Sequence, residues 1–281
     1  MYLLVNDDGI HATGIKMLQQ VFDQQQLAYT IVAPDSNCSG YSHALTLDKP
    51  IKVRQFADNH IAVDGTPVDC VHISLNGLLK DKPVISRVVS GINRGANLGD
   101  DALYSGTVAA AMEGRFLQHS ALAVSLASFV PQHWPTAVAI VTQLLEKLPS
   151  LQLAERSILN VNIPDLPLSS IKGFKVTRLG ARNRSDDIVE TVDPRGSVGY
   201  WICLAGTPLD CGEGTDFHAV ANGYVSLTPL CPDLTAHELI ADTQQWLADS
   251  EIEHKHVEKI SNIHYTCGLR SVCRSNKRWV K

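Results

Sequence analysis

The sequence predicts an α/β fold built on a parallel sheet, and three features of its N-terminal part predict it. A short apolar run, Tyr2 to Val5, has the length and composition of a buried parallel strand. Ile15, Leu18 and Phe22 then recur at the spacing of one helix face. A second apolar run, Leu27 to Val32, completes a strand–helix–strand unit of the kind that connects parallel strands.

The rest of the chain continues this alternation of strands and helices. Strands are expected at 83–89, 121–126 and 158–161, and helices at 66–78, 105–116 and 135–148. Short apolar segments on both sides of Asp48-Lys49-Pro50 predict a hairpin. Between Phe174 and Thr228, β-like runs alternate with glycine, proline and charged turns, which indicates an antiparallel excursion and a candidate oligomer contact. A last helix is expected from Thr235 to Leu247.

Composition is that of an ordinary soluble globular protein. The chain has 281 residues, of which 44% are hydrophobic and 19% charged, enough for one large domain or two small ones. The net charge of -5 gives no general attraction to nucleic acid or anionic membranes. No run of 18 apolar residues and no signal peptide is visible. Seven scattered cysteines without CxxC spacing favour a reduced, cytoplasmic setting.

The motif Asn6-Asp7-Asp8-Gly9 directly follows the first apolar run. In open α/β sheets, ligands bind at the carboxyl ends of the strands. Adjacent carboxylates at such a place repel each other, so a cation offsets the cost of holding them together. Mg²⁺ and Mn²⁺ prefer oxygen ligands of this kind. An Asp-rich turn that caps the next helix is the alternative interpretation.

The polar loop from Pro34 to His43 follows the second strand. A right-handed crossover places the end of that strand beside the end of the first. Ser39 can therefore approach Asp7 and Asp8, although a plain surface loop would have the same composition.

A second dense motif spans Ser90 to Val108. Glycines spaced by four residues alternate there with Asn93 and Asn97, so that backbone and amide groups can approach a metal or a phosphate. Ser105-Gly106-Thr107 then opens a helix whose free N–H groups form an anion site, though N-capping alone would also explain these residues. The chain has neither a P-loop nor a GxGxxG dinucleotide motif.

Taken together and in this order, the motifs resemble those of the survival protein SurE family of nucleotidases. The resemblance runs from residue 1 to about 248. The matching segments are Asn6 to Gly9, Ala33 to Asp35, Ser39-Gly40, Thr46-Leu47, Gly65 to Val71, Ser90 to Asn93, Gly95, Asn97 to Asp101, Tyr104 to Val108, Asp193 to Gly196, Tyr200-Trp201, Gly214 to Phe217, Gly223 to Ser226 and Asp233 to Ala236.

The resemblance implies a metal-dependent phosphatase that acts on nucleoside monophosphates. This would be a 5′-nucleotidase, with 3′-nucleotidase activity and hydrolysis of short polyphosphate as extensions. The family's metal ligands carry over to Asp7, Asp8, Ser39 and Asn93, which would hold one Mg²⁺ or Mn²⁺ per subunit.

The resemblance also implies an architecture. The expected fold is a Rossmann-like three-layer α/β/α sandwich with a protruding antiparallel β-hairpin region and a C-terminal helix, both exchanged between the subunits of a dimer or tetramer. The nucleotidase domain would cover 1–249, with the hairpin excursion at about 174–230 inside it. The tail 250–281, which has seven Lys or Arg against three Glu, would be a solvated appendage or a basic arm.

In the mechanism that this implies, the ion activates water and neutralises phosphate charge. Asp8 orients the attacking water, a role that Asp7 can share. Asn97 and the N–H groups of Ser105-Gly106-Thr107 bind the remaining phosphate oxygens. His11 and His43 lie near these loops in sequence and are candidates for the acid that protonates the leaving group, although ordinary loop histidines are the simpler interpretation.

Two departures from the family pattern are modest. Cys38 stands where the family often has a basic residue, and 84–87 replaces the usual Pro-Asp run. Two other functional classes are alternatives. A phosphoaspartyl-transferring phosphatase normally separates its two aspartates by one residue, whereas Asp7 and Asp8 are adjacent. A non-catalytic nucleotide- or RNA-binding module would not need the full set of metal ligands.

Overall fold

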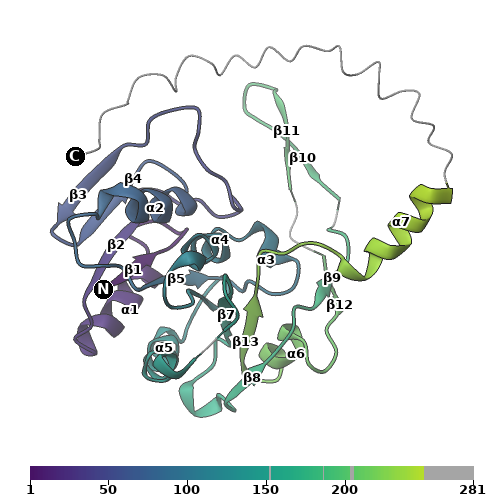
Figure 1. Ribbon diagram of the computed structural model, residues 1–281. Coiled ribbons are helices and arrows are strands. Elements are labelled where there is room, and N and C mark those ends of the chain that lie inside the picture. Colours follow the sequence, from purple (N-terminus) through teal and green to yellow (C-terminus); the bar gives the residue numbers. More distant parts are fainter. Residues whose placement is uncertain (152, 186, 203–205, 250–281) are drawn as a thin grey trace. The chain divides into compact units, whose positions relative to one another are not determined.

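The computed structural model describes residues 1–151, 153–185, 187–202 and 206–249 of the chain (Figure 1). The chain divides into two compact units, Met1–Pro232 and Asp233–Lys281. The first unit contains the sheet and every candidate site residue. The basic tail at 250–281 lies outside the described residues.

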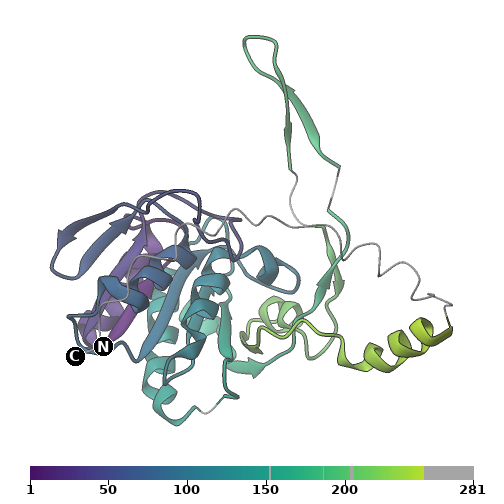
Figure 2. The same ribbon diagram turned by 45° about the horizontal axis from the view of Figure 1, so that its top comes forward.

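A nine-stranded, mostly parallel sheet forms the centre of the described part of the first unit (Figures 1 and 2). Its six central strands run parallel. At one edge β3 pairs antiparallel with β4; at the other, β13 pairs antiparallel with β7 and parallel with β8. In spatial order the strands are β3 (Val53–Ala57), β4 (His60–Val63), β2 (Tyr29–Pro34), β1 (Tyr2–Val5), β5 (Arg87–Arg94), β6 (Leu122–Leu126), β7 (Ile158–Ile163), β13 (Val225–Leu230) and β8 (Phe174–Val176).

Helices cover both faces of this sheet, which confirms the Rossmann-like α/β fold expected from the sequence (Figure 2). On one face α1 (Thr13–Gln24) packs with α5 (Trp134–Lys147), and the predicted face of α1 is buried in their shared core. On the other face α2 (Pro67–Ile73) packs with α4 (Gly106–Glu113) over a second core. Burial of apolar surface on both faces is the main force that holds the layers together.

Shorter elements complete the described chain. They are η1 (Ser74–Leu78), α3 (Asp101–Tyr104), η2 (Gly114–Phe116), η3 (Leu148–Ser150), η4 (Leu168–Ser170), β9 (Ala181–Arg182), β10 (Val189–Val192), β11 (Val198–Trp201), β12 (Pro208–Asp210), α6 (Asp216–Ala221), η5 (His237–Leu239) and α7 (Ile240–Asp249). None of the helices in the described part of the chain combines the length and hydropathy that crossing a bilayer requires.

The prediction of a hairpin around Asp48-Lys49-Pro50 is wrong. The hairpin lies further along the chain, where β3 pairs with β4. Thr46 is instead tied to the start of α2, because its N–H and hydroxyl donate to the two carboxylate oxygens of Asp69 at 2.9 and 2.6 Å. Asp69 also accepts from the backbone of Thr66 and so closes a capping box, which fixes the helix end that the sequence predicted.

The excursion between β8 and β13 contains two small antiparallel ladders and the helix α6, which the sequence did not predict. The β10–β11 hairpin pairs with no other strand among the described residues and extends away from the main sheet in Figure 2. Its side chains are largely exposed, with Trp201 at 67%. An isolated two-stranded hairpin is only marginally stable in water. Exposed apolar residues on such a hairpin are typical of an interaction surface.

Helix α1 and strand β5 approach so closely that one position between them has no room for a side chain. A Cβ added to Gly14 would lie 1.8 Å from the carbonyl oxygen of Ile92. Since that oxygen belongs to the backbone of a central strand, the helix would have to move instead.

We expect Gly14→Ala to lower the free energy of unfolding by about 1–3 kcal/mol, because the cost of overpacking exceeds the gain in helix propensity. Urea unfolding followed by circular dichroism measures the change. Gly212→Ala is the matched control, since a Cβ there meets no atom within 4 Å, and it should stay within about 0.5 kcal/mol of the wild type. Equal stability of all three proteins would show that α1 does not sit against β5 in this way.

A polar cluster centred on Glu113 ties the 35–50 loop to the helices below it. The Glu113 carboxylate contacts His43 Nε2 at 3.2 Å and His72 Nδ1 at 2.9 Å, and Arg115 lies at 3.5 Å. The hydrogen bond from His43, with that from His72, lowers the pKa of Glu113 to about 2 despite its partial burial.

This depressed pKa predicts how the contribution of Glu113 to stability depends on pH. The contribution is fully present above the ordinary value of 4.5 and is lost as the pH falls towards 2, because only the unfolded chain takes up the proton in that interval. The difference in unfolding free energy between wild type and Glu113→Gln should therefore be largest above about pH 4.5 and shrink below it. The exposed Glu146→Gln serves as the control. A difference that grew in acid would contradict the assignment.

Candidate metal and phosphate site

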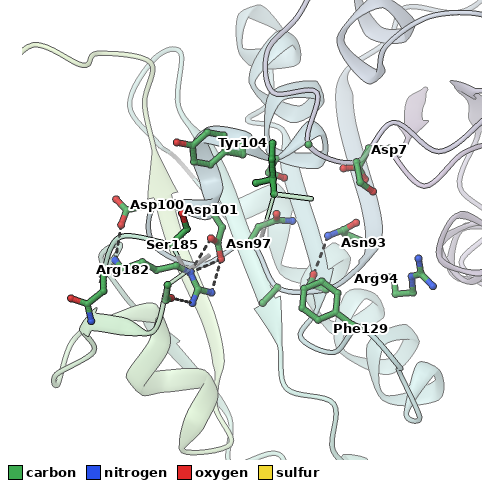
Figure 3. Close-up of a pocket in the computed structure, with 18 of the residues that line it drawn as sticks. Asp7, Asn93, Arg94, Asn97, Asp100, Asp101, Tyr104, Phe129, Arg182 and Ser185 are labelled. Atoms are coloured by element: carbon green, nitrogen blue, oxygen red, sulfur yellow. Dashed lines mark hydrogen bonds and ion pairs between the residues drawn. The ribbon is translucent and has the colours of Figure 1, made fainter. Parts of the chain in front are cut away.

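The predicted site residues gather where the carboxyl ends of β1 and β5 face the N-terminus of α4. A cavity of about 750 Å³ opens there, and Figure 3 shows its lining. Five of the eight predicted residues line it: Asp7, Ser39, Asn93, Asn97 and Ser105. The other three adjoin it, because Gly106 and Thr107 contact Asp7 and Asp8 follows Asp7 in the chain.

Asp7 is buried, with 3% of its surface exposed, and Thr107 holds both of its carboxylate oxygens. The Thr107 hydroxyl donates to Oδ1 at 2.6 Å and the Thr107 N–H donates to Oδ2 at 3.2 Å. Gly106 allows this approach, since a Cβ there would lie 2.9 Å from the Cβ of Asp7. Burial, assisted by the charge of Asp8, raises the pKa of Asp7 to about 6 against these hydrogen bonds.

Asp8 points to the other side of the same turn. Its Oδ2 accepts a hydrogen bond from the backbone N–H of Arg94 at 3.1 Å, and burial raises its pKa. It lines a second hollow of about 310 Å³ together with Asn37 and Arg94. Arg94 lines both hollows, whereas Asp7 lines the first and Asp8 the second.

The loop that carries Ser39 is fixed to the site by backbone contacts. The Cys38 N–H donates to the carbonyl oxygen of Asp7 at 2.8 Å, and the Ser39 N–H donates to the side chain of Asn37 at 2.8 Å. Further along, the Ser42 N–H donates to the carbonyl of Tyr104 at 3.1 Å. The Ser39 hydroxyl is therefore presented to the cavity from a loop held at both ends, as the crossover argument predicted.

Asn93 is the second-last residue of strand β5, rather than part of the loop after it, and its amide is oriented. The side-chain N–H donates to the carbonyl of Gly95 at 3.0 Å, which leaves the side-chain oxygen as the group available to a ligand. Figure 3 shows this amide close to Asp7 on one side of the cavity.

A buried amide network fixes Asn97. Its backbone N–H donates to the side chain of Asn162 at 2.7 Å, and its side-chain N–H donates to Ser125 at 2.7 Å. Asn160 and Asn162 both donate to its carbonyl oxygen. Asn97 is thus held rigidly by the ends of β6 and β7, and its side-chain oxygen has no hydrogen-bonding partner among the described residues.

Sequence reasoning missed the opposite wall of the cavity. That wall is the segment 182–185, and Phe129, from the loop after β6, was missed as well, although Figure 3 shows it on the side of Asn93. Arg182 anchors the segment, since its guanidinium binds the Asp101 carboxylate at 2.6 Å and its backbone N–H donates to the Asp100 carboxylate at 2.6 Å. Contacts between residues some 80 positions apart leave no local signal in the sequence, although the arginine-rich run Arg182-Asn183-Arg184 was a clue.

His11 and His43 are not part of the cavity. His11 packs edge-on against Phe56, with 5.5 Å between ring centroids. His43 binds Glu113. Both positions agree with the simpler interpretation of these residues as loop histidines.

The residues present suit a hard divalent cation. The Asp7 carboxylate accepts hydrogen bonds from Thr107, and within the described chain it forms no ion pair with a cationic side chain. Asn93 directs an amide oxygen, and Ser39 a hydroxyl, to the same cavity. The described residues contain no group of three or more His, Cys, Asp or Glu side chains placed to hold a metal ion, and the candidate donors are carboxylate, amide and hydroxyl oxygens.

Comparisons with known proteins agree with this geometry. The family model described as "Survival protein SurE" matches residues 2–186. A crystal structure of the SurE protein from Aquifex aeolicus is 40% identical to this chain and superposes with a TM-score of 0.75. The match covers 88% of this chain and 99% of that one. The family is known for metal-dependent nucleotidases. On these grounds, the chain belongs to the survival protein SurE family.

Proposed function

We propose that this protein hydrolyses the phosphomonoester of nucleoside monophosphates, as a 5′-nucleotidase that depends on one Mg²⁺ or Mn²⁺ per subunit. Nucleoside 3′-monophosphates and short polyphosphate are the further candidate substrates. The observation that carries the proposal is the placement of the buried Asp7 carboxylate, which has no cationic partner among the described residues, beside the directed amide oxygen of Asn93. The cavity next to them, at about 750 Å³, has room for more than a phosphate group.

Asp7, Asp8, Ser39 and Asn93 would hold the ion, which supplies a Lewis acid that lowers the pKa of water and neutralises phosphate charge. Asp8 would orient the attacking water from the second hollow, which it lines beside Arg94. Asp7 is held by Thr107 and fixes the ion's position.

Phosphate oxygens are bound by the side chain of Asn97 and by the N–H groups at Ser105 and Gly106. Asn97 is rigid before substrate arrives, so it loses little entropy on binding. The donors of Thr107 are engaged by Asp7, so this residue acts on phosphate through the carboxylate that it positions.

We further propose that the nucleotidase domain covers 1–249, with 250–281 as an appended tail, and that the protein works in the cytoplasm as a homodimer or tetramer. The four described cysteines, Cys38, Cys70, Cys211 and Cys231, are free, which suits a reducing compartment. Exposed apolar residues of the β10–β11 hairpin, among them Tyr200 at 60%, support its insertion into a partner subunit.

The activity is tested by phosphate release from nucleoside 5′- and 3′-monophosphates and from short polyphosphate. We expect release with Mn²⁺ or Mg²⁺, loss of at least 100-fold with EDTA, and recovery when metal is restored. No release with any metal would favour a non-catalytic nucleotide-binding module.

Asp8→Asn should reduce turnover at saturating metal by about 100-fold or more while the thermal unfolding midpoint stays near that of the wild type, because the substitution keeps the shape of the side chain. Calorimetric titration with Mn²⁺ should show weaker binding. Asp81→Asn, at an exposed position outside both hollows, is the control. A fully active Asp8→Asn enzyme would refute the ligand assignment.

Trp201→Glu should shift the protein towards smaller assemblies, because it places a charge on the hairpin's apolar surface. Light scattering coupled to size exclusion gives the mass. Thr191→Glu adds the same charge to the neighbouring strand without removing an aromatic ring and should have a smaller effect. Identical masses at all concentrations would remove the hairpin from the interface.

A further inference from the structure

The cavity has an aromatic wall that the hydrolysis of phosphate does not require. Phe129 lines it, and 70% of the side chain is exposed. Covering an exposed phenylalanine ring with a flat apolar surface is favourable in free energy, because it removes apolar area from water. The ring lies on the same side of the cavity as the candidate metal ligands Asp7 and Asn93 (Figure 3).

The ring is seated before any ligand binds. It lies over Gly95, where an added Cβ would come within 3.1 Å of a ring carbon. Its loop is held by hydrogen bonds from Ala127 N–H to the Ile163 carbonyl at 2.8 Å and from Val130 N–H to the Ser128 hydroxyl at 3.2 Å. One face of the ring is thus supported by backbone, and the remaining surface is open to the cavity.

The same Gly95 fixes the ring relative to the candidate metal ligands. Its carbonyl oxygen accepts the hydrogen bond that orients the Asn93 amide. Figure 3 shows Phe129 close to Asn93 and well apart from Tyr104, the other exposed aromatic residue of the cavity. A ligand whose phosphate binds at the ion that Asn93 would help to hold therefore has the Phe129 ring within reach of its other end.

We propose that Phe129 is a stacking platform for the nucleobase and gives the site its selectivity for nucleotides over other phosphomonoesters; this inference rests on the proposed function. Every base offers a π-face, so such a platform accepts purines and pyrimidines alike. Its preference is for the aromatic ring of the leaving nucleoside, rather than for a particular hydrogen-bonding edge.

The test compares nucleoside 5′-monophosphates with ribose 5-phosphate, which has the same sugar and phosphate but no base. We measure the ratio of kcat/KM for the two substrates in wild type, Phe129→Leu and Phe129→Trp. Leucine keeps apolar bulk without a π-face, so the ratio should fall roughly 10-fold or more, mainly through KM. Tryptophan should keep the ratio or raise it. Phe116→Ala is the matched control, because Phe116 is 67% exposed and lies outside both hollows.

Equilibrium binding of the same two ligands in EDTA, measured by calorimetry, separates this inference from the proposed function. If no substrate is hydrolysed but Phe129→Leu abolishes a preference for the nucleotide over ribose 5-phosphate, the platform stands and the nucleotidase proposal fails. If hydrolysis is metal-dependent and the ratio is unchanged in Phe129→Leu, the platform is overturned. If Phe129→Leu changes the mass of the assembly in light scattering but leaves the ratio of kcat/KM unchanged, the ring is a subunit contact and the inference is overturned. The inference is also overturned if the wild type shows no preference for the nucleotide over ribose 5-phosphate.

Discussion

The burial of the Asp7 carboxylate beside a second carboxylate is the constraint on which the site depends. The rise in the pKa of Asp7 to about 6 corresponds to a few kcal/mol by which the folded, ion-free protein disfavours its charge. The fold offsets only part of this cost. Thr107 supplies two hydrogen bonds, Gly106 removes the side chain that would keep the helix away, and the N-terminus of α4 directs its partial positive charge towards β1. In the proposed function, the uncompensated remainder would favour binding of a divalent cation.

The surrounding architecture keeps the oxygen donors in place. Asn93 is oriented by a backbone carbonyl, Ser39 by a loop bonded at both ends, and Asn97 by amides from two neighbouring strands. Rigid donors lose little freedom when a ligand arrives, which is why pre-organised polar groups contribute more to binding than mobile ones. The parallel sheet matters for this reason: it brings strand ends that are distant in sequence to one edge.

Much of this could be predicted from the sequence. Strands followed at once by Asn6-Asp7-Asp8-Gly9 or by the glycine–asparagine motif mark the ligand edge of a sheet, because burial and turn chemistry are local properties. The expected role of Thr107 needed correction in detail, since its donors face Asp7 rather than open space. The prediction of a hairpin near Asp48 failed because Asp69 binds Thr46. Helix α6 and the wall at 182–185 were not predicted because long-range ion pairs and packing fix them.

Gly95 supports both the Asn93 amide and the Phe129 ring, so a shift of this backbone unit moves both together. Substrate preference therefore cannot be retuned by displacing the strand end without disturbing the chemistry. The side chain at 129, by contrast, projects from a connecting loop and can be exchanged alone. In evolutionary terms, the backbone at Gly95 must be inherited unchanged, whereas the side chain at position 129 is free to vary. Diversification of substrate range among such proteins should therefore proceed through the loop after β6.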